Sequence, residues 1–188
     1  MVIQYLAVLD FEATCWKNSN DHEIIEFPTV IIDLDKKEVV DKIQIFVRPV
    51  KNPCLSEFCK ELTGIKQEWV DKGIDLEEAI KLHSKFLSKY DNLIIVTCGD
   101  WDLKTMLPQE TQIRKLIVPS VYGKWINIKR IFKEFYKRDK ELGMVGMLNK
   151  LDLKLLGRHH SGLDDCVNIA QICIKLVNSG WNPSNVKI

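Results

Sequence analysis

The residues that could do chemistry begin with two carboxylates, Asp10 and Glu12, at the end of an apolar run that starts at Tyr5. Side chains alternate along a strand, so both acids would share one face with Leu6 and Val8. Carboxylates that continue an apolar face are costly to bury unless they are paired or bound to a cation. The pair is therefore a candidate for a metal site. For a lone Asp-x-Glu at a strand end, the simpler interpretation is that the strand reaches the surface and both acids are solvated.

A third acidic position, Asp102, follows a short apolar segment at 92–98 that ends before Gly99. The segment is predicted to be a buried strand. Taken alone, the residues after it are explained equally well by a helix start. Asp100 would then cap the helix, and Asp102 would interact favourably with the helix dipole.

The clearest helix of the sequence, 161–179, carries two adjacent aspartates near its start. Ser161 followed by Asp164 resembles a capping box. At helical spacing, Asp164 shares a polar face with Asn168, Gln171 and Lys175, whereas Asp165 shares an apolar face with Ile169, Ile172 and Leu176. We therefore predict that Asp164 is structural. Asp165 is predicted to point toward the core, where its charge needs a partner, and a cation would serve.

The elements that must position these residues form an alternating pattern. Strands are predicted at 5–11, 23–34, 38–47, 92–98 and 125–128, and helices at 75–90, after 128 and at 161–179. The first strand is apolar on both faces, which is typical of a central strand covered on both sides. The polar residues 35–37 indicate a hairpin turn. Three strands in a meander, followed by strands alternating with helices, predict an α/β fold with a mixed sheet.

Composition limits the class of protein. The 188 residues are 46% hydrophobic and 28% charged, which predicts one globular domain covering 1–188. The formal net charge of +1 excludes a general attraction of the whole surface to nucleic acid, so any attraction to phosphate must be local. The six cysteines form no Cys-x-x-Cys pair, which leaves zinc-finger and redox motifs unsupported. The N-terminus does not read as a signal peptide and no apolar run has membrane-spanning length. We therefore expect an intracellular protein, in the cytoplasm or nucleus, with reduced thiols and no membrane partner.

The acidic positions belong to a longer pattern that covers nearly the whole chain. Asp-x-Glu at 10–12, a central Asp at 102 and His-x-x-x-x-Asp at 160–165 occur in this order. The accompanying motifs are Asp10–Cys15, Glu23–Pro28, Leu62–Ile65, Lys124–Asn127 and Gly162–Asp165. The chain thereby resembles the DEDDh exonucleases and, within them, the Eri-type branch of enhanced-RNAi and histone-mRNA 3′-end exonucleases. Gly162 is one departure, since the wider DEDDh group often has Ala there.

The resemblance implies an RNase H-like fold with a five-stranded mixed sheet flanked by helices. It also implies two divalent cations, Mg²⁺ with Mn²⁺ able to substitute. The catalytic residues that it implies are Asp10, Glu12, Asp102 and Asp165 as metal ligands and His160 as the general base. An imidazole suits a general base because its ordinary pKa is about 6.5. Without the acids, His160 would be read as an ordinary loop histidine.

The resemblance also implies contacts with the substrate. These contacts are Phe11, Ala13, Thr14, Ile65, Trp101 and Met106. The backbone of the first two and the side chain of Thr14 would meet the terminal nucleotide, Ile65 would wedge against its base, and Trp101 or Met106 would line the pocket. The alternative is that the side chains are part of the core. A basic stretch, 124–140, with Lys129, Lys133 and Lys137 at helical spacing, could track the substrate backbone or be a solvated helix face.

The predicted activity is therefore a 3′→5′ exonuclease that releases nucleoside 5′-monophosphates from the free 3′ end of RNA. We expect the protein to act as a monomer, and the sequence names no protein partner. Two alternatives remain open. One is a DNase or mixed nuclease on the same fold, because no residue visibly reads the 2′-hydroxyl. The other is an inactive module that binds nucleic acid or protein, against which the complete acidic set argues.

Overall fold

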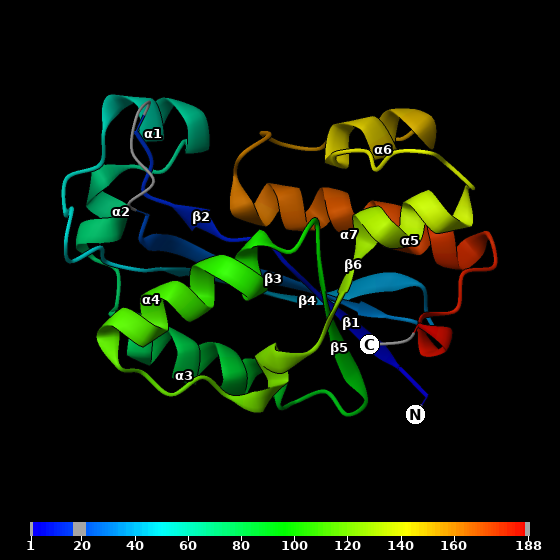
Figure 1. The fold of residues 1–188 in the computed structure, drawn as a ribbon, viewed down its shortest axis with the longest axis horizontal. Coiled ribbons are helices and arrows are strands. Elements are labelled where there is room, and N and C mark those ends of the chain that lie inside the picture. The colour runs from blue at the N-terminus through cyan, green and yellow to red at the C-terminus, as the bar shows by residue number, and fades with distance from the viewer. Residues whose placement is uncertain (1, 17–21, 187–188) are drawn as a thin grey trace.

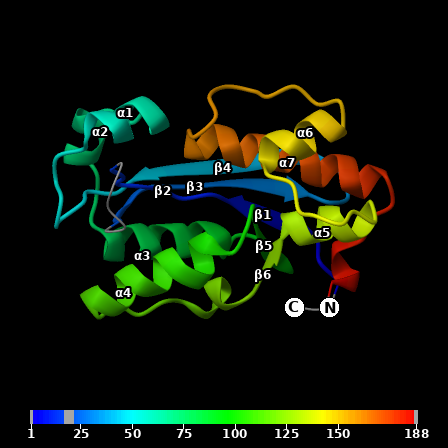
Figure 2. The same cartoon turned by 45° about the horizontal axis from the view of Figure 1, so that its top comes forward.

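A mixed β-sheet forms the centre of the molecule, and helices cover both of its faces (Figures 1 and 2). The computed structural model describes residues 2–16 and 22–186. The strands are β1 (Tyr5–Leu9), β2 (Glu12–Ala13), β3 (Ile24–Asp33), β4 (Glu38–Phe46), β5 (Leu93–Thr97) and β6 (Trp125–Asn127). The α-helices are α1 (Glu57–Thr63), α2 (Gln67–Asp71), α3 (Leu76–Leu87), α4 (Leu107–Arg114), α5 (Ile128–Phe135), α6 (Met144–Lys150) and α7 (Gly162–Asn178). A π-helix spans Trp101–Met106. In Figure 2, α3 and α4 lie on one face of the sheet and α6 and α7 on the other.

Strand β1 is central, antiparallel to β3 and parallel to β5, and β6 continues the sheet beyond β5. β4 pairs with the other edge of β3 through the hairpin predicted at 35–37. β1 pairs with residues 29–33 of β3, and β2 pairs with residues 24–26 of the same strand. The six strands therefore occupy five positions, because β2 continues the line of β1 after a break. This confirms the predicted five-stranded mixed sheet.

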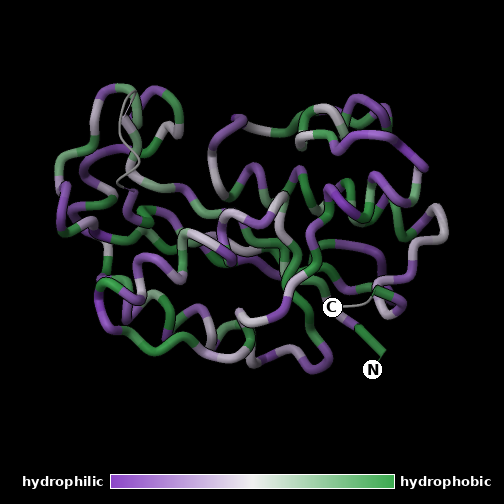
Figure 3. Tube along the Cα trace, viewed as in Figure 1, coloured by the Kyte–Doolittle hydropathy of each residue, from purple (hydrophilic) through white to green (hydrophobic). Residues whose placement is uncertain are grey.

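The alternation of side chains along β1 divides the core into two halves. Leu6 and Val8 belong to the cluster that contains the apolar face of α7. Ala7 and Leu9 belong to the opposite cluster, which contains the buried face of α3. All four are fully buried, as predicted for a strand covered on both sides. Figure 3 shows polar and apolar residues alternating along α7, the pattern of a helix with one face on a sheet.

The predicted elements differ from the structure mainly at their ends. The predicted strand 125–128 stops at Asn127, because the Asn127 side chain accepts a hydrogen bond from the Lys129 amide and so begins α5. Helices α1, α2, α4 and α6 were not predicted. They have only five to eight residues, too few for a clear period.

Two further features bear on the class of protein. Within 2–16 and 22–186, no helix has both the length and the apolar character needed to cross a bilayer. All six cysteines are free thiols, and Cys59, Cys166 and Cys173 are buried.

Candidate active site

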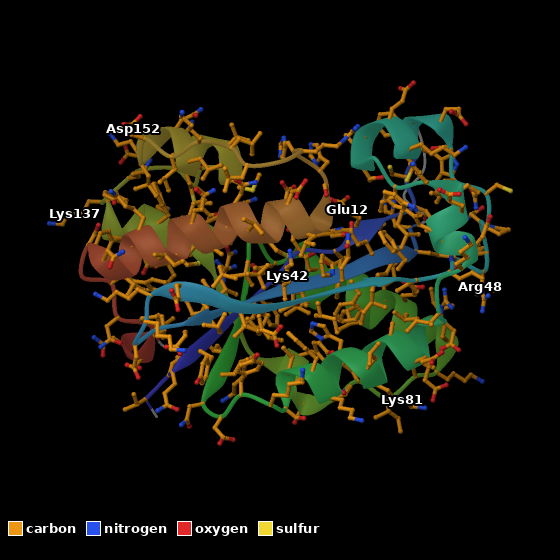
Figure 4. All side chains as sticks on the ribbon, turned by 180° about the vertical axis from the view of Figure 1, so that it is seen from behind. Glu12, Lys42, Arg48, Lys81, Lys137 and Asp152 are labelled. Carbon is orange, nitrogen blue, oxygen red and sulfur yellow. The ribbon has the colours of Figure 1, made fainter. Side chains whose placement is uncertain are left out.

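Four carboxylates from distant parts of the chain meet at one edge of the sheet. Asp10 lies in the break after β1, Glu12 in β2, Asp102 in the π-helix after β5, and Asp165 in the first turn of α7. Side-chain oxygens of Asp10, Glu12 and Asp165 lie within 4.8 Å of one another. Asp102 Oδ1 accepts a 2.9 Å hydrogen bond from the amide of Phe11, which places it beside the same segment. Figure 4 shows Glu12 next to the N-terminal end of α7.

The topology explains this meeting. Because β1 and β5 are parallel, their carboxyl ends lie at the same edge of the sheet, and Asp10 and Asp102 follow those two ends. The pairing with β3 keeps one register from β1 to Glu12, so the side chain of Glu12 stays on the side of α7 with Leu6 and Val8. The register shifts only after this residue, between Glu12 and Ala13. Helix α7 packs across β3 and brings Asp165 to the same point.

Glu26 of β3 holds the start of α7 in place. Its two carboxylate oxygens accept hydrogen bonds from the amides of Gly162 at 3.1 Å and Leu163 at 3.3 Å. Gln44 of β4 donates a further bond of 2.8 Å to the same carboxylate. A β-strand acid thus satisfies the free amides of the helix end and interacts favourably with the helix dipole. The predicted capping box was wrong: Ser161 is the N-cap residue, but its side chain makes no capping bond.

Gly162 is required by the closeness of this contact. A Cβ atom at position 162 would lie 2.9 Å from Pro28 Cγ, 3.0 Å from the carbonyl oxygen of Asp10 and 3.0 Å from Glu26 Oε2. Such separations are shorter than normal carbon contacts, so an Ala would displace the helix end from Asp10. The departure from the wider group at this position therefore has a structural reason.

Burial disfavours the charged form of all four acids, and neighbouring carboxylates add to this effect at Asp10 and Glu12. Burial, followed by the charges of Asp102, Glu12 and Asp165, raises the pKa of Asp10 well above its ordinary value. Burial and the charge of Glu26 raise the pKa of Glu12 to about 9. Burial also raises the pKa of Asp102 and of Asp165 to about 6. Four acids whose ionised forms are disfavoured in this way need positive charge nearby.

One oxygen marks the place where a cation fits. Asp165 Oδ1 is buried and has no hydrogen-bond partner among the described residues. The other oxygen, Oδ2, accepts a 3.0 Å bond from the amide of His160. An unpaired buried carboxylate oxygen, close to two further carboxylates, has the donor chemistry that a hard divalent cation prefers. The arrangement therefore fits a divalent metal site.

His160 stands at the mouth of this cluster. Its backbone has φ of 67°, a left-handed conformation that is uncommon for a residue with a side chain, and its amide is held by Asp165. Nitrogen atoms of His159 and His160 lie within 4.8 Å of Asp165, and the two rings stack with centroids 3.8 Å apart. Partial burial and then the charges of His159 and Arg158 lower the pKa of His160. The neutral imidazole, which can accept a proton, is thereby favoured near pH 7.

The two adjacent aspartates have different surroundings, as their helical phase predicted. Asp164 Oδ2 accepts a 2.9 Å bond from the amide of Arg158 and so braces the loop that precedes α7. The polar face of α7 that carries Asp164 is partly buried. Asn168 is fully buried, and its side chain bonds the amide and carbonyl of Leu156 at 2.8 Å each. That face therefore supports the loop that carries His160.

The predicted substrate contacts are mostly covered. Phe11, Ala13, Thr14, Ile65 and Met106 are buried, and Trp101 is 43% exposed. Thr14 Oγ1 accepts a bond from the amide of Glu23. The indole of Trp101 lies 6.0 Å from the ring of His22, which contacts the Thr14 carbonyl. The substrate contacts remain predictions.

Two further residues at the site, Glu26 and Lys129, are not distinguished by local sequence pattern alone. Glu26 lay within a quoted motif, and its signal was an acid inside an otherwise apolar strand. Lys129 was grouped with the basic stretch, but it lines the same hollow as Asp10, His160 and Asp165. Lys137, from the same stretch, lies at the far end of the molecule from Glu12 (Figure 4). The stretch is therefore not one continuous surface over the active site.

Comparisons with known proteins agree with this geometry. A family model described as "Exonuclease" matches residues 7–173. Human "ERI1 exoribonuclease 2" is 36% identical over 202 residues, covering 95% of this chain and 29% of that protein. Rat "3'-5' exoribonuclease 1" is 40% identical over 185 residues, covering 94% of this chain and 54% of that protein. The chain thus spans from under a third to about half of the length of these two relatives.

Solved structures are similar over nearly the whole chain. A nuclease domain described as "3'hExo, a DEDDh family member, bound to rAMP" has a TM-score of 0.89 at 36% identity and covers 95% of this chain and 94% of that one. A structure described as "3'-end specific recognition of histone mRNA stem-loop by 3'-exonuclease" has a TM-score of 0.90 at 34% identity and covers 97% and 85%. With the acidic cluster and the histidine in place, the chain belongs to the exonuclease family, in the Eri-type branch of its DEDDh members.

Proposed function

We propose that this protein is a metal-dependent 3′→5′ exoribonuclease that releases nucleoside 5′-monophosphates. The observation that carries the proposal is the meeting of four acids beside His160, with one buried oxygen of Asp165 unpaired. A merely structural cluster of acids would be expected to have neutralising partners. The names of the relatives, which are exoribonucleases, and the RNA and rAMP bound in two similar structures support RNA as the substrate.

The ligands of the metal would be the carboxylates of Asp10, Glu12, Asp102 and Asp165. We propose Mg²⁺, with Mn²⁺ able to substitute, because hard cations prefer carboxylate and phosphate oxygens. When bound, two such ions stabilise the charge on the attacking and leaving oxygens of the phosphodiester. The protein's own contribution is to fix the carboxylates: Phe11 holds Asp102, and the α7 helix end holds Asp165.

His160 takes the proton from the attacking water. The water oxygen then bonds to phosphorus, the bond from phosphorus to the 3′-oxygen of the preceding nucleotide breaks, and that oxygen gains a proton from solvent. The shortened strand keeps a 3′-hydroxyl, and the released nucleotide keeps the phosphate at its 5′ position. The lowered pKa of His160 keeps the imidazole in its proton-accepting form at neutral pH. Asp165 orients the base through the His160 amide as well as serving the metal site.

The test is degradation of 5′-labelled single-stranded RNA, with DNA of the same sequence in parallel. We expect a ladder of shortening RNA fragments with Mg²⁺ or Mn²⁺, nucleoside 5′-monophosphates as products, and no degradation in excess EDTA. Faster degradation of DNA would favour the DNase alternative. Cleavage of circular single strands would indicate an endonuclease, and no cleavage of any substrate would leave the binding module as the better description.

The variant His160→Ala separates the base from the metal ligands. We expect it to lose 10²- to 10⁴-fold in rate, on the order of the usual contribution of a general base, while still being stabilised by Mn²⁺. His159→Ala is the matched control, because that ring stacks on His160 and its charge lowers the pKa of His160, but it is not the proposed base. We expect this control to lose far less activity than His160→Ala. A near-normal rate for His160→Ala would remove this residue from the mechanism.

A further inference from the structure

The acidic cluster has two flanks, and the predicted nucleotide contacts occupy one of them. On that flank, the exposed ring of Trp101 lies near His22, which in turn contacts Thr14. The other flank is the junction between β6 and α5, which Figure 1 shows leading up beside α7. A strand whose last nucleotide is held on the first flank must leave the site over another surface. The β6–α5 junction is a candidate for that surface.

The junction is bonded to the loop that carries Asp102. Asp100 Oδ1 accepts bonds from Trp125 Nε1 at 3.1 Å and from Asn127 Nδ2 at 3.2 Å. Asp100 also forms an ion pair with Arg130. The Asn127 side chain connects the two segments: its Nδ2 donates to Asp100, and its Oδ1 accepts a bond from the Lys129 amide at the start of α5. The cations of α5 are therefore held at a fixed place relative to the carboxylates.

Lys129 is a cation inside the active-site hollow. It lines a cavity of about 270 Å³ together with Asp10, His160 and Asp165. Its Nζ would lie 3.5 Å from a Cβ atom at Gly99, where φ of 125° favours glycine, so this ammonium lies against the backbone next to the catalytic loop. No carboxylate forms an ion pair with Lys129 among residues 2–16 and 22–186. An ammonium at such a place can contact a phosphate oxygen.

A second hollow is formed by the same two segments of the chain as the first, since Arg130 follows Lys129 and Asp100 is two residues after Cys98. It has a volume of about 470 Å³ and is lined by Lys104, Lys124 and Arg130, together with Asp100. Lys104 and Lys124 are exposed and, in the described part of the chain, have no ion-pair partner. Only Arg130 is neutralised, by Asp100. In a chain of net charge +1, this is a local excess of positive charge beside the acidic cluster.

We propose that the β6–α5 junction guides the substrate strand into the site. Lys129 contacts the phosphate that is cleaved, and Lys104 and Lys124 contact phosphates on its 5′ side. The proposal rests on the proposed nuclease activity and adds the path of the single strand to it. Lysines contact phosphates without reading bases, which suits an enzyme that must accept each nucleotide in turn.

Different substrate lengths separate the two roles. A dinucleotide without a 5′-phosphate has only the phosphodiester that is cleaved and no phosphate on its 5′ side, whereas a 15-nucleotide strand extends over the second hollow. For Lys104→Gln/Lys124→Gln, we expect the ratio of kcat/KM on the 15-mer to that on the dinucleotide to fall. For single strands each phosphate contact contributes about 0.7 to the slope of log kcat/KM against log salt concentration. Between 50 and 200 mM KCl the wild type should therefore lose about sevenfold more activity on the 15-mer than the double variant does.

Lys129→Gln should behave differently, because its phosphate is present in both substrates. We expect kcat to fall on the order of 10²-fold for both lengths, as when one charge-stabilising donor is removed from an active site. Lys129→Arg should restore most of the activity.

The charge-matched control for Lys104→Gln/Lys124→Gln is Lys42→Gln/Lys85→Gln, which replaces two exposed lysines of β4 and α3. Its salt dependence and its length ratio should equal those of the wild type.

The outcomes distinguish this proposal from the proposed function. If the wild type degrades neither substrate with Mg²⁺ or Mn²⁺, the nuclease function fails. If the wild type is active and Lys104→Gln/Lys124→Gln keeps both its length ratio and its salt slope, the strand path is refuted. An unchanged kcat for Lys129→Gln refutes the contact with the cleaved phosphate. The melting temperature of each variant is the control for folding. A value close to that of the wild type establishes that a loss of activity does not come from unfolding.

Discussion

Replacing Asp165 with Asn should abolish activity yet stabilise the metal-free protein. The change keeps the side-chain shape, and the remaining oxygen can still accept the hydrogen bond from the His160 amide. It removes a charge that faces the proposed metal ligands Asp10 and Glu12. Activity should fall by orders of magnitude, because the site loses a ligand. Mn²⁺ should no longer raise the melting temperature as it does for the wild type.

The stabilisation can be worked out from the Asp165 carboxyl. Burial raises its pKa from 3.8 to about 6, which corresponds to about 3 kcal/mol against the charged form. Because Asp165 lines an open hollow, solvent screens part of this energy. We therefore expect the charge of Asp165 to lower the free energy of unfolding by about 1–2 kcal/mol. A raised carboxyl pKa favours the folded state at low pH, and this contribution is lost as the pH rises through 6. At pH 7.5 in EDTA, Asp165→Asn should therefore melt about 2–8 °C above the wild type, and at pH 5 the difference should shrink.

Asp164→Asn is the matched control, because it makes the same chemical change one residue away. The Asn oxygen can still accept the bond from the Arg158 amide, so this variant should lose about 1 kcal/mol or less and remain active. Thermal melting at both pH values, with EDTA and with Mn²⁺, and cleavage of labelled RNA check both variants. An inactive Asp164→Asn beside an active Asp165→Asn would refute the assignment, and a lower melting temperature of Asp165→Asn in EDTA would refute the electrostatic argument.

Further predictions concern the surroundings of the site. Gly162→Ala should cost about 1–3 kcal/mol and weaken metal binding, because its Cβ would press on Pro28; an unchanged urea midpoint and metal affinity would contradict this. Arg158→Ala should lower kcat more than it raises KM, because the guanidinium donates to the carbonyl of Glu61 and ties the loop of the proposed base to the end of α1; equal effects on both constants would argue against that role. Burial lowers the pKa of His83 to about 3, so the unfolded chain binds its proton first and stability should fall by up to about 1.4 kcal/mol per pH unit below pH 6.5. Urea unfolding of the wild type and of His83→Gln at pH 7 and pH 5 checks this, and equal pH dependence in both would contradict it.

Local periodicity was enough to predict most of the framework. The apolar run of β1 predicted a central strand, and the acids at alternate positions after it were candidates for a site; the structure has both features. Helical phase alone separated Asp164 from Asp165, which the structure places against the loop and against the acidic cluster respectively. These inferences succeeded because the direction of a side chain on a strand or helix depends only on its position along that element.

Contacts between distant elements could not be predicted in this way. Glu26 caps α7 from β3, 136 residues away in sequence from Gly162, so the sequence around Ser161 suggested a local cap that the fold does not use. Gly162 is required by the approach of Pro28, and Lys129 reaches the acids because Asn127 and Asp100 join two separate elements. Periodicity tells which side of an element a residue occupies, but the neighbour that it meets is set by how the elements pack. Periodicity was therefore enough to predict the strands and the direction of Asp165, and the resemblance to the DEDDh pattern was needed to assign Asp102 and His160. The groups that hold and approach these residues were determined by packing.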